Sequence, residues 1–150
     1  MNLLIDHLYK YPQHRAAAAQ LIYQEFWTDV PGYSAAKMEQ RLAHASDPDR
    51  IPLSLIALLD NQVVGAINLI EDDGNGPPDE PPWLAGLVVA QALRGQGIGS
   101  ALVTALLAHA KRLGYAQVHL GTDGPGFYER LGGNITQQRG DAFWIVRFDL

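Results

Sequence analysis

The chain contains no cysteine, has fewer basic than acidic residues and has no long apolar run. The absence of cysteine excludes disulfides, thiolate metal ligands and a cysteine nucleophile. A total of 11 Lys and Arg against 16 Asp and Glu gives a net charge of −5, which argues against nucleic acid or an anionic membrane as a partner. No apolar run reaches the roughly 20 residues that a membrane span needs. The N-terminal residues also lack the basic start and long apolar core of a signal peptide. We therefore expect a cytoplasmic protein.

The size of the chain sets the scale of the fold. With 150 residues, of which 47% are hydrophobic, the chain can bury a sizeable core. No internal repeat and no linker-like segment divides it, so we expect a single domain over residues 1–150. The five histidines show no H-E-x-x-H or similar spacing, so we expect no metal site.

Apolar periodicity and turn residues predict the order of strands and helices. Strands are expected at residues 3–5, 53–59, 63–70, 84–89 and 116–121, and in a terminal hairpin built from Ile135 and residues 143–148. Helices are expected from Pro12 to about Trp27, after the N-cap Ser34, over residues 100–113 and over residues 127–131. Asp60-Asn61 predicts a tight hairpin turn, and the proline-, glycine- and acid-rich residues 72–82 predict a loop.

The order of these elements indicates the class of fold. The early strands pair antiparallel, whereas residues 84–121 form a strand, a helix and a strand, which is a parallel crossover. Residues 84–89 are nearly all apolar, which is typical of a strand that is covered on both faces. We therefore predict an α/β fold with one mixed sheet and helices on both sides of it.

A glycine-rich stretch, Arg94-Gly95-Gln96-Gly97-Ile98-Gly99-Ser100, stands between the strand at 84–89 and the following helix. A turn of this kind presents free backbone N–H groups and the positive end of the helix dipole to an anion. Gly97 and Gly99 have no Cβ to keep a phosphate away from the backbone, and Arg94 adds a charged fork that suits phosphate. The stretch predicts a site for a diphosphate-bearing ligand; the alternative is a plain strand-to-helix turn.

Three phosphate-binding patterns can be compared with this stretch. The P-loop pattern G-x-x-x-x-G-K-S/T fails because no lysine follows the glycines. The dinucleotide pattern G-x-G-x-x-G fails because Ser100 replaces its third glycine and no acidic residue ends the strand at 116–121. The third pattern, Q/R-x-x-G-x-G/A, fits Arg94 to Gly99 at every defined position.

Two motifs resemble the signatures of one enzyme family. Val88-Val89 followed by Arg94 to Leu102 resembles the acyl-CoA-binding motif of the GNAT superfamily of N-acetyltransferases, and Gly126 to Gly132 resembles its second signature. The resemblance covers residues 51–150 well and residues 1–50 loosely. It implies the GNAT acyltransferase fold and an enzyme that uses acetyl-CoA. It also implies that the acetyl group moves to a primary amine by direct attack in a ternary complex.

A closer likeness, to the branch that acetylates the processed N-terminus of actin, is carried by residues 88–95, 118–120 and 127–128. An acidic peptide terminus calls for a basic acceptor cleft, whereas the cleft expected here is acidic. Only the reaction is therefore carried over from this branch, and not its substrate.

The family resemblance also assigns residues to the cofactor. It implies that backbone groups of Leu87, Val88 and Val89 hold the pantetheine like an added strand, with one N–H facing the thioester oxygen. Phe127 would lie beside the cofactor, and the pyrophosphate would lie against the loop residues Arg94, Gly95, Gln96, Gly97, Ile98, Gly99 and Ser100. Tyr128 matches the tyrosine that faces the sulfur, where a phenol with a reference pKa near ~10 donates a proton to the leaving thiolate. Packing under the sheet is the alternative role of Tyr128.

No residue stands out as the general base. Many relatives carry a glutamate in the strand before the loop, where this chain has alanine and glycine. Glu71 is the first candidate, with Asp72 beside it at the end of the preceding strand; a solvated strand end is the alternative for both. Asp123 and His119 are further candidates, and water could also relay the proton from an amine of low pKa.

The acceptor cleft is expected among the first two helices, the strand end at Glu71 and the terminal hairpin. These segments contribute acids and aromatics that suit a cationic amine, namely Glu25, Trp27, Tyr33, Glu71, Asp72 and Trp144. We expect a small-molecule or peptidyl amine as acceptor, a monomer or homodimer, and neither nucleic acid nor membrane as partner. An acidic surface that only keeps the protein in solution is the alternative.

Two other functions stay open at this point. A non-catalytic acyl-CoA-binding module would account for the missing strand carboxylate. A nucleotide-binding regulatory domain would use the same glycine-rich loop for a different diphosphate.

Overall fold

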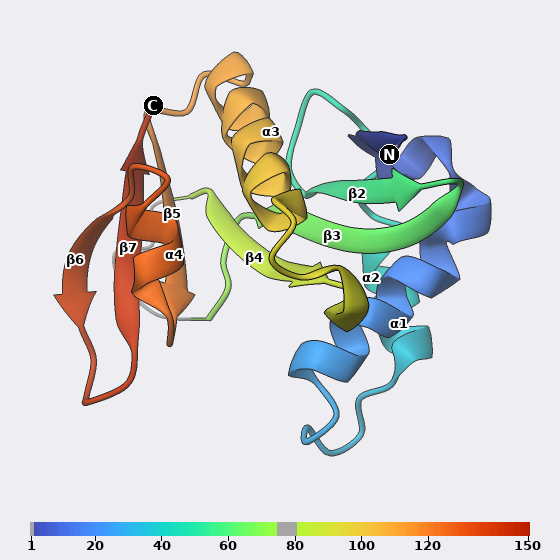
Figure 1. Cartoon of the computed structure of the whole chain (residues 1–150), viewed down its shortest axis with the longest axis horizontal. Helices are drawn as coiled ribbons and strands as arrows, with labels where there is room; N and C mark the ends of the chain where they lie inside the picture. Colours follow the sequence, from blue (N-terminus) through green and yellow to red (C-terminus); the bar gives the residue numbers. More distant parts are fainter. Residues whose placement is uncertain (1, 75–80) are drawn as a thin grey trace.

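The computed structural model describes residues 2–74 and 81–150 (Figure 1). Within these residues, seven strands form one sheet in the order β1-β2-β3-β4-β5-β7-β6. The strands are β1 (Leu3–His7), β2 (Leu53–Leu59), β3 (Gln62–Ile70), β4 (Trp83–Val89), β5 (Gln117–Thr122), β6 (Asn134–Gln138) and β7 (Trp144–Asp149). The helices are α1 (Arg15–Phe26), α2 (Ala35–Leu42), α3 (Ile98–Arg112) and α4 (Pro125–Glu129), with short 3-10 turns η1 (Leu8–Lys10), η2 (Pro12–His14) and η3 (Gln91–Leu93).

The pairing of the strands confirms the predicted class of fold. β1 to β4 pair antiparallel in sequence order. Helix α3 then carries the chain across the sheet, so that β5 runs parallel to β4. In the C-terminal hairpin, β7 and not β6 lies beside β5. The result is an α/β fold with a mixed sheet.

Helices cover both faces of the sheet and create two hydrophobic cores. Helix α3 packs on one face against Leu55 and Ala57, and α1 and α2 pack on the other face against Ile56 and Leu58. Successive residues of a strand point to opposite faces, which explains why β2 is apolar almost throughout. Figure 1 shows α3 crossing in front of β3, and α1 and α2 passing behind it.

Local turn and cap signals agree with the structure. Asp60 and Asn61 have φ angles of 50° and 65°, as a type I′ turn between β2 and β3 requires. The Ser34 side chain accepts a hydrogen bond from the Lys37 backbone N–H at 3.1 Å and so caps α2. These features depend on residues that are close in the sequence, which is why the sequence predicts them.

Three helices begin at residues other than those predicted, and one of them is α3, which starts at Ile98 instead of Ser100. Pro12 opens a 3-10 turn, and α1 itself starts at Arg15. Helix α4 starts at Pro125, two residues before the predicted position, because the fixed φ of proline suits the first turn of a helix. The middle of the predicted loop, residues 75–80, lies outside the described residues.

Strand β4 is distorted at its centre, and this distortion separates it from β5. Its register with β3 shifts opposite residues 66–68, and Gly86 has a φ of +64°, which together mark a β-bulge. In the described chain, β4 and β5 share one register pair, Trp83 with His119, and Figure 1 shows the two strands diverging from there. The centre of β4 is therefore only half buried, which corrects the expectation of a strand covered fully on both faces.

Candidate active site

The glycine-rich loop leads directly into α3. Gly97 is the N-cap residue with a φ of +87°, and Gly95 has a φ of +78°. A Cβ at either position would meet no described atom within 4 Å, so the backbone conformation, and not crowding, calls for glycine here. Ala101 donates the first backbone hydrogen bond of the helix, to the carbonyl oxygen of Gly97. The N–H groups that precede it have no intrahelical acceptor and face an incoming anion.

A cavity of about 530 Å³, here named the glycine-loop cavity, lies beside this loop. Its lining comes from α1, β4, the loop, the start of α3 and α4, and consists of Glu25, Leu87, Val88, Val89, Leu93, Arg94, Gly95, Gly97, Ile98, Gly99, Ser100, Phe127 and Arg130. Every residue predicted to bind the cofactor therefore lines this cavity except Gln96, which is exposed and lies outside the described lining. Arg130 is a second cation at the cavity that the sequence analysis missed, although it stands two residues after Tyr128 in the second motif.

Arg94 is held at the mouth of the glycine-loop cavity by two contacts. Its Nε donates a hydrogen bond to the carbonyl oxygen of Val89 at 3.0 Å, and its Nη2 lies 3.0 Å from the Oε2 of Glu25. The side chains of this ion pair are 49% and 40% exposed. Glu25 was predicted to lie in the acceptor cleft. Because the last turn of α1 faces the loop, Glu25 lies instead at the glycine-loop cavity, on the other side of β4 from that cleft.

Beyond the register pair of Trp83 with His119, the edge of β4 that faces β5 has no strand partner among the described residues. Ala90 donates its N–H to Val64 and so points toward β3. Because alternate residues of a strand direct their N–H and C=O groups to opposite sides, Val89 points away from β3, toward the gap between β4 and β5, where its carbonyl oxygen already accepts a hydrogen bond from Arg94. This open edge offers the place that an extended chain such as pantetheine needs.

Tyr128 lies on α4 next to the glycine-loop cavity. Its ring makes edge-on contacts with Phe127 at 5.0 Å and Phe148 at 6.4 Å between ring centroids. Burial, with a smaller effect of the Asp123 carboxylate, raises the pKa of Tyr128 to about 12. The phenol therefore stays protonated at neutral pH. Tyr128 is not itself among the described residues that line the cavity, whereas its neighbour Phe127 is.

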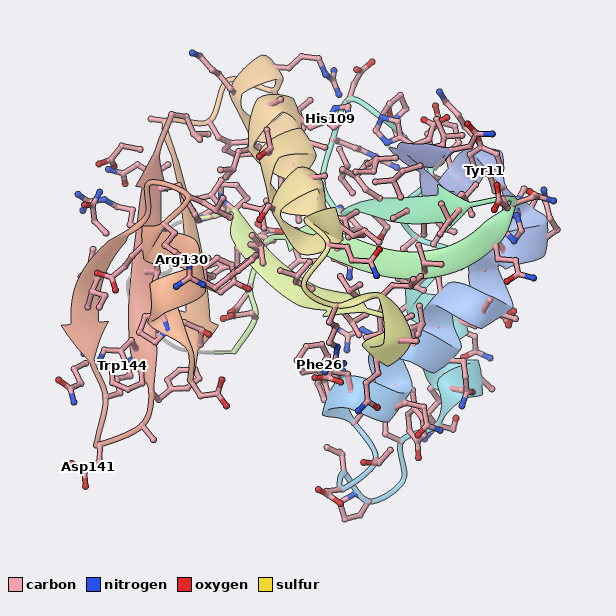
Figure 2. All side chains as sticks on the ribbon, in the orientation of Figure 1. Tyr11, Phe26, His109, Arg130, Asp141 and Trp144 are labelled. Atoms are coloured by element: carbon pink, nitrogen blue, oxygen red, sulfur yellow. The ribbon has the colours of Figure 1, made fainter. Side chains whose placement is uncertain are left out.

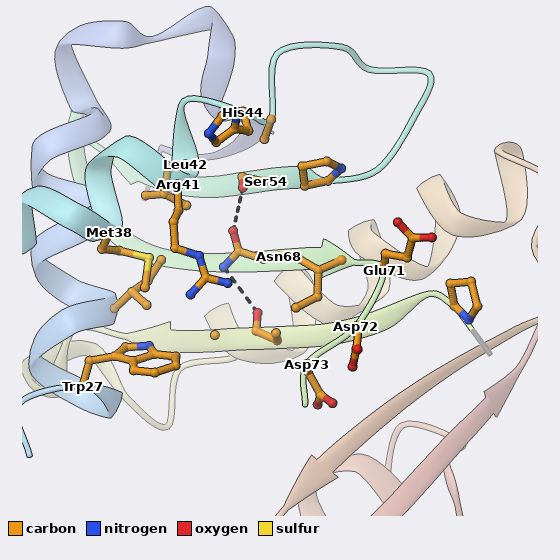
Figure 3. A pocket seen from close by; sticks show the side chains of 17 residues that line it. Trp27, Met38, Arg41, Leu42, His44, Ser54, Asn68, Glu71, Asp72 and Asp73 are labelled. Atoms are coloured by element: carbon orange, nitrogen blue, oxygen red, sulfur yellow. Dashed lines mark hydrogen bonds between the residues drawn. The ribbon is translucent and has the colours of Figure 1, made fainter. Parts of the chain in front are cut away.

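A second and larger cavity, here named the α2 cavity, lies on the other side of the bulge in β4 (Figure 3). Its volume is about 990 Å³, and its described lining consists of Ile22, Trp27, Met38, Arg41, Leu42, His44, Ala45, Pro52, Ser54, Asn68, Ile70, Glu71, Asp72, Asp73, Pro81, Ala85 and Gly86. Trp27, Glu71 and Asp72 are thus brought together as the sequence analysis expects. Tyr33 is outside this lining and packs against Trp27 with 4.9 Å between ring centroids.

The floor of the α2 cavity is a buried polar network that joins three strands. Ser54 donates its hydroxyl to the Oδ1 of Asn68 at 2.6 Å, and the Nδ2 of Asn68 donates to the carbonyl oxygen of Ala85 at 3.3 Å (Figure 3). A Cβ on Gly86 would lie 2.8 Å from that same nitrogen. The network therefore ties Asn68 to the bulge in β4 and requires glycine there. The sequence signal for it, polar residues inside otherwise apolar strands, is too common to single these residues out.

The acidic side chains of the α2 cavity lie apart from its basic residues. Figure 3 shows Glu71, Asp72 and Asp73 on one side and Arg41 and His44 on the other. The acids follow β3, whereas Arg41 belongs to α2. Arg41 and His44 were not predicted here, because nothing in the sequence in and after α2 tells a solvated polar side chain from one that lines a cavity.

The remaining candidates lie away from both cavities. Asp123 is exposed after β5. His119 is buried against the ring of Trp83, and its Nδ1 has no hydrogen-bond partner among the described residues. Figure 2 shows Trp144 on β7, at the opposite end of the sheet from α1 and α2. None of these three residues belongs to the described lining of either cavity.

The described residues hold neither a cluster of metal-ligating side chains nor a membrane-spanning helix. No group of three or more His, Cys, Asp or Glu side chains in residues 2–74 and 81–150 is arranged to hold a metal ion. None of the helices in this part of the chain has the length and apolar character that crossing a membrane requires.

Comparisons with solved structures show the same fold. An aminoglycoside 6′-N-acetyltransferase complexed with coenzyme A has a TM-score of 0.76 at 20% identity, with 97% of this chain and 96% of that chain covered. The protein yncA of Salmonella typhimurium with its cofactor acetyl-CoA has a TM-score of 0.76 at 15% identity, with 100% and 95% covered. The PaiA N-acetyltransferase of Thermoplasma acidophilum in complex with coenzyme A has a TM-score of 0.65 at 18% identity, with both chains covered completely (100% and 100%).

The sequence itself was compared in two ways. No curated protein matches the chain with significance, and the closer likeness to the actin-acetylating branch is not confirmed. The sequence model of the acetyltransferase (GNAT) family matches residues 19–132, which include the glycine-rich loop and the aromatic motif on α4. The predicted family and the predicted class of enzyme, an acyltransferase, are confirmed by this match. The chain belongs to the acetyltransferase (GNAT) family.

Proposed function

We propose that the chain, as one domain over residues 1–150, transfers the acetyl group of acetyl-CoA to a primary amine by direct attack in a ternary complex. One observation carries the proposal: consecutive residues of β4 line both cavities. Ala85 and Gly86 line the α2 cavity, and Leu87 to Val89 line the glycine-loop cavity. A ligand that follows β4 from the loop therefore reaches the α2 cavity at the bulge.

The pyrophosphate and the pantetheine of acetyl-CoA each have matching groups at the glycine-loop cavity. The free N–H groups at the start of α3, together with Arg94 and Arg130, provide a positive site for the pyrophosphate. The open edge of β4 offers backbone groups to the pantetheine amides, although the carbonyl oxygen of Val89 is bonded to Arg94 in the free protein. The related structures named above contain coenzyme A or acetyl-CoA. Bound in this way, acetyl-CoA supplies an activated acyl group at the border of the two cavities.

Residues around that border donate one proton and accept another during the reaction. When the amine nitrogen bonds to the acyl carbon and the carbon–sulfur bond breaks, the leaving sulfur needs one proton and the nitrogen must lose one. Tyr128 stays protonated up to high pH and is the donor to the sulfur. Glu71, with Asp72 beside it, is the acceptor of the amine proton, directly or through water.

The acceptor occupies the α2 cavity. Its volume of about 990 Å³ suits a small molecule or the end of a peptide. Glu71 and Asp72 attract a protonated amine, and the ring of Trp27 offers a cation–π surface. Attack requires the neutral form of the amine, and a carboxylate that accepts the proton at the cavity wall meets that need.

The release of free thiol from acetyl-CoA, measured with a panel of primary amines, tests the proposal. Tyr128→Phe should lower kcat by about a hundredfold, within the usual range for general acid catalysis, while the Kd for CoA changes less than twofold. Tyr115→Phe is the control, because this tyrosine lines neither cavity in the described chain. Tight CoA binding without turnover of any amine would instead favour the acyl-CoA-binding module, and tighter binding of ATP or NAD than of CoA would favour the nucleotide-binding domain.

A further inference from the structure

Arg41 projects into the α2 cavity without a carboxylate partner among the described residues. Its Nη1 donates to the hydroxyl of Tyr33 at a long 3.4 Å, and its guanidinium lies 5.9 Å from the centre of the Trp27 ring. Aromatic groups therefore pack beside the guanidinium, and most of its N–H donors have no acceptor among residues 2–74 and 81–150.

Several other arginines of the chain are paired with a carboxylate. Arg94, Arg112 and Arg147 each form an ion pair with a carboxylate at 2.9–3.0 Å. Arg41 shares a cavity with several acidic side chains, and yet Figure 3 shows Glu71 and Asp72 on the opposite side. The cavity thus presents a cation and the carboxylates of Glu71 and Asp72 to a common space, and no ion pair joins Arg41 to either of them in the described part of the chain.

Resting on the proposed function, we infer that Arg41 binds a carboxylate of the acceptor, so that the preferred acceptors are amines that also carry an acidic group. The planar fork of a guanidinium matches a carboxylate through two parallel hydrogen bonds. The amine end then lies toward Glu71 and Asp72, at the border with β4 where the acyl group arrives. A free amino acid or a short amino-carboxylic acid has both groups.

Arg41 also weighs against acceptors that carry only positive charge. A polycationic amine in this cavity would bring one of its ammonium groups close to the guanidinium, and like charges at short range repel. The aminoglycoside acetyltransferase among the similar structures shares the fold at 20% identity, and a likeness of this degree concerns the fold alone. Arg41 is therefore a residue that determines specificity.

Matched acceptors that differ only in the carboxylate provide the test. We would measure kcat/KM for lysine and for cadaverine, which is lysine without its carboxylate, with acetyl-CoA at a saturating concentration. We expect lysine to be preferred at least tenfold. In Arg41→Gln, kcat/KM for lysine should fall about ten- to hundredfold, mainly through KM, because a hydrogen bond between charged groups is lost. The value for cadaverine should change less than twofold.

Two further variants separate the charge of Arg41 from its place on α2. Arg41→Lys should restore part of the activity on lysine, since it keeps the charge and loses the fork. Lys37→Gln removes a charge from the same helix outside the described cavity lining and should leave the preference unchanged. An unchanged Kd for CoA in each variant shows that the protein is folded.

Three outcomes would overturn the inference. Equal kcat/KM values for lysine and cadaverine, or an equal fall of both values in Arg41→Gln, would show that Arg41 does not bind an acidic group of the acceptor. A higher kcat/KM for phosphoethanolamine than for β-alanine would show that Arg41 binds a phosphate and not a carboxylate. If no amine of any kind is acetylated, the proposed function fails as well, whereas turnover without a carboxylate preference defeats this inference alone.

Discussion

Glu25→Gln should strengthen the binding of CoA, although it removes a residue from the wall of the cofactor site. In the free protein, Arg94 is paired with Glu25 at 3.0 Å, and in the complex its guanidinium is needed by the pyrophosphate. Glu25 therefore competes with the cofactor for the same cation. Removal of the carboxylate leaves Arg94 available and also removes a negative charge from beside the phosphates.

The structure gives the size of this effect. An ion pair whose side chains are 49% and 40% exposed contributes about 0.2–1 kcal/mol, so Glu25→Gln should tighten CoA binding by up to about fivefold. A charge-assisted hydrogen bond from Arg94 to phosphate contributes roughly 1.5–3 kcal/mol. Since Arg94→Gln also removes the cost of breaking the ion pair, the net loss should be about 1–2 kcal/mol, which corresponds to a Kd roughly 5- to 30-fold higher.

Calorimetric titration of CoA into the four proteins of a double-mutant cycle measures these changes. In the presence of Arg94→Gln, the gain from Glu25→Gln should disappear, because there is no guanidinium left to release. The gain should also shrink at 0.5 M salt, where exposed charges are screened. Glu39→Gln changes the same charge outside the described lining of both cavities and serves as the control. Weaker CoA binding in Glu25→Gln would refute the competition between Glu25 and the cofactor.

Three further predictions concern pH and glycine. Because burial raises the pKa of Tyr128 to about 12, kcat should show no loss from tyrosine ionisation below about pH 10; a loss below that pH that is absent in Tyr128→Phe would contradict the assignment. Burial lowers the pKa of both His7 and His109, whose rings are 4.6 Å apart. The unfolded chain then binds more protons near pH 6, so Tm should fall as the pH drops below about 6.5, and His109→Gln should weaken that fall. Gly86→Ala should cost more stability in urea than Gly74→Ala, since both have positive φ and only the former puts a Cβ 2.8 Å from a buried amide; equal costs would count against a role for that contact.

The parts of the fold that depend on neighbouring residues could be predicted from the sequence. The turn at Asp60-Asn61, the cap at Ser34 and the glycine-rich start of α3 each need only a few adjacent residues, and all three are found where they are expected. The apolar run of residues 53–59 likewise predicted the strand β2, whereas its place between two helical layers is seen only in the structure. The lining of the glycine-loop cavity was predictable for the same reason, because most of it comes from one continuous segment.

Features that depend on distant segments could not be predicted. The place of β7 beside β5 is a pairing between strands separated by a helix and a third strand, and no local signal sets it. Glu25 and Arg94 are 69 residues apart, so the ion pair between them appears only in three dimensions. The same holds for Arg41, whose neighbours in the α2 cavity come from other elements of the chain.

A second group of unpredicted features comes from the bulge in β4. The hydrogen bonds of Asn68 to Ser54 and Ala85 bring three strands together at a point where Gly86 leaves the regular strand geometry. Periodicity alone described residues 84–89 as a plain buried strand. The bulge separates β4 from β5, and through that separation a single strand borders both the cofactor site and the acceptor site.

A crystal structure of the protein with bound CoA tests the central claim most directly. We predict that the pyrophosphate lies within hydrogen-bond distance of the backbone N–H groups from Gly95 to Ser100, that the pantetheine follows Leu87 to Val89, and that the sulfur lies beside the hydroxyl of Tyr128 at the border of the α2 cavity. An empty glycine-loop cavity with CoA bound elsewhere, or a sulfur directed away from the α2 cavity, would contradict the account.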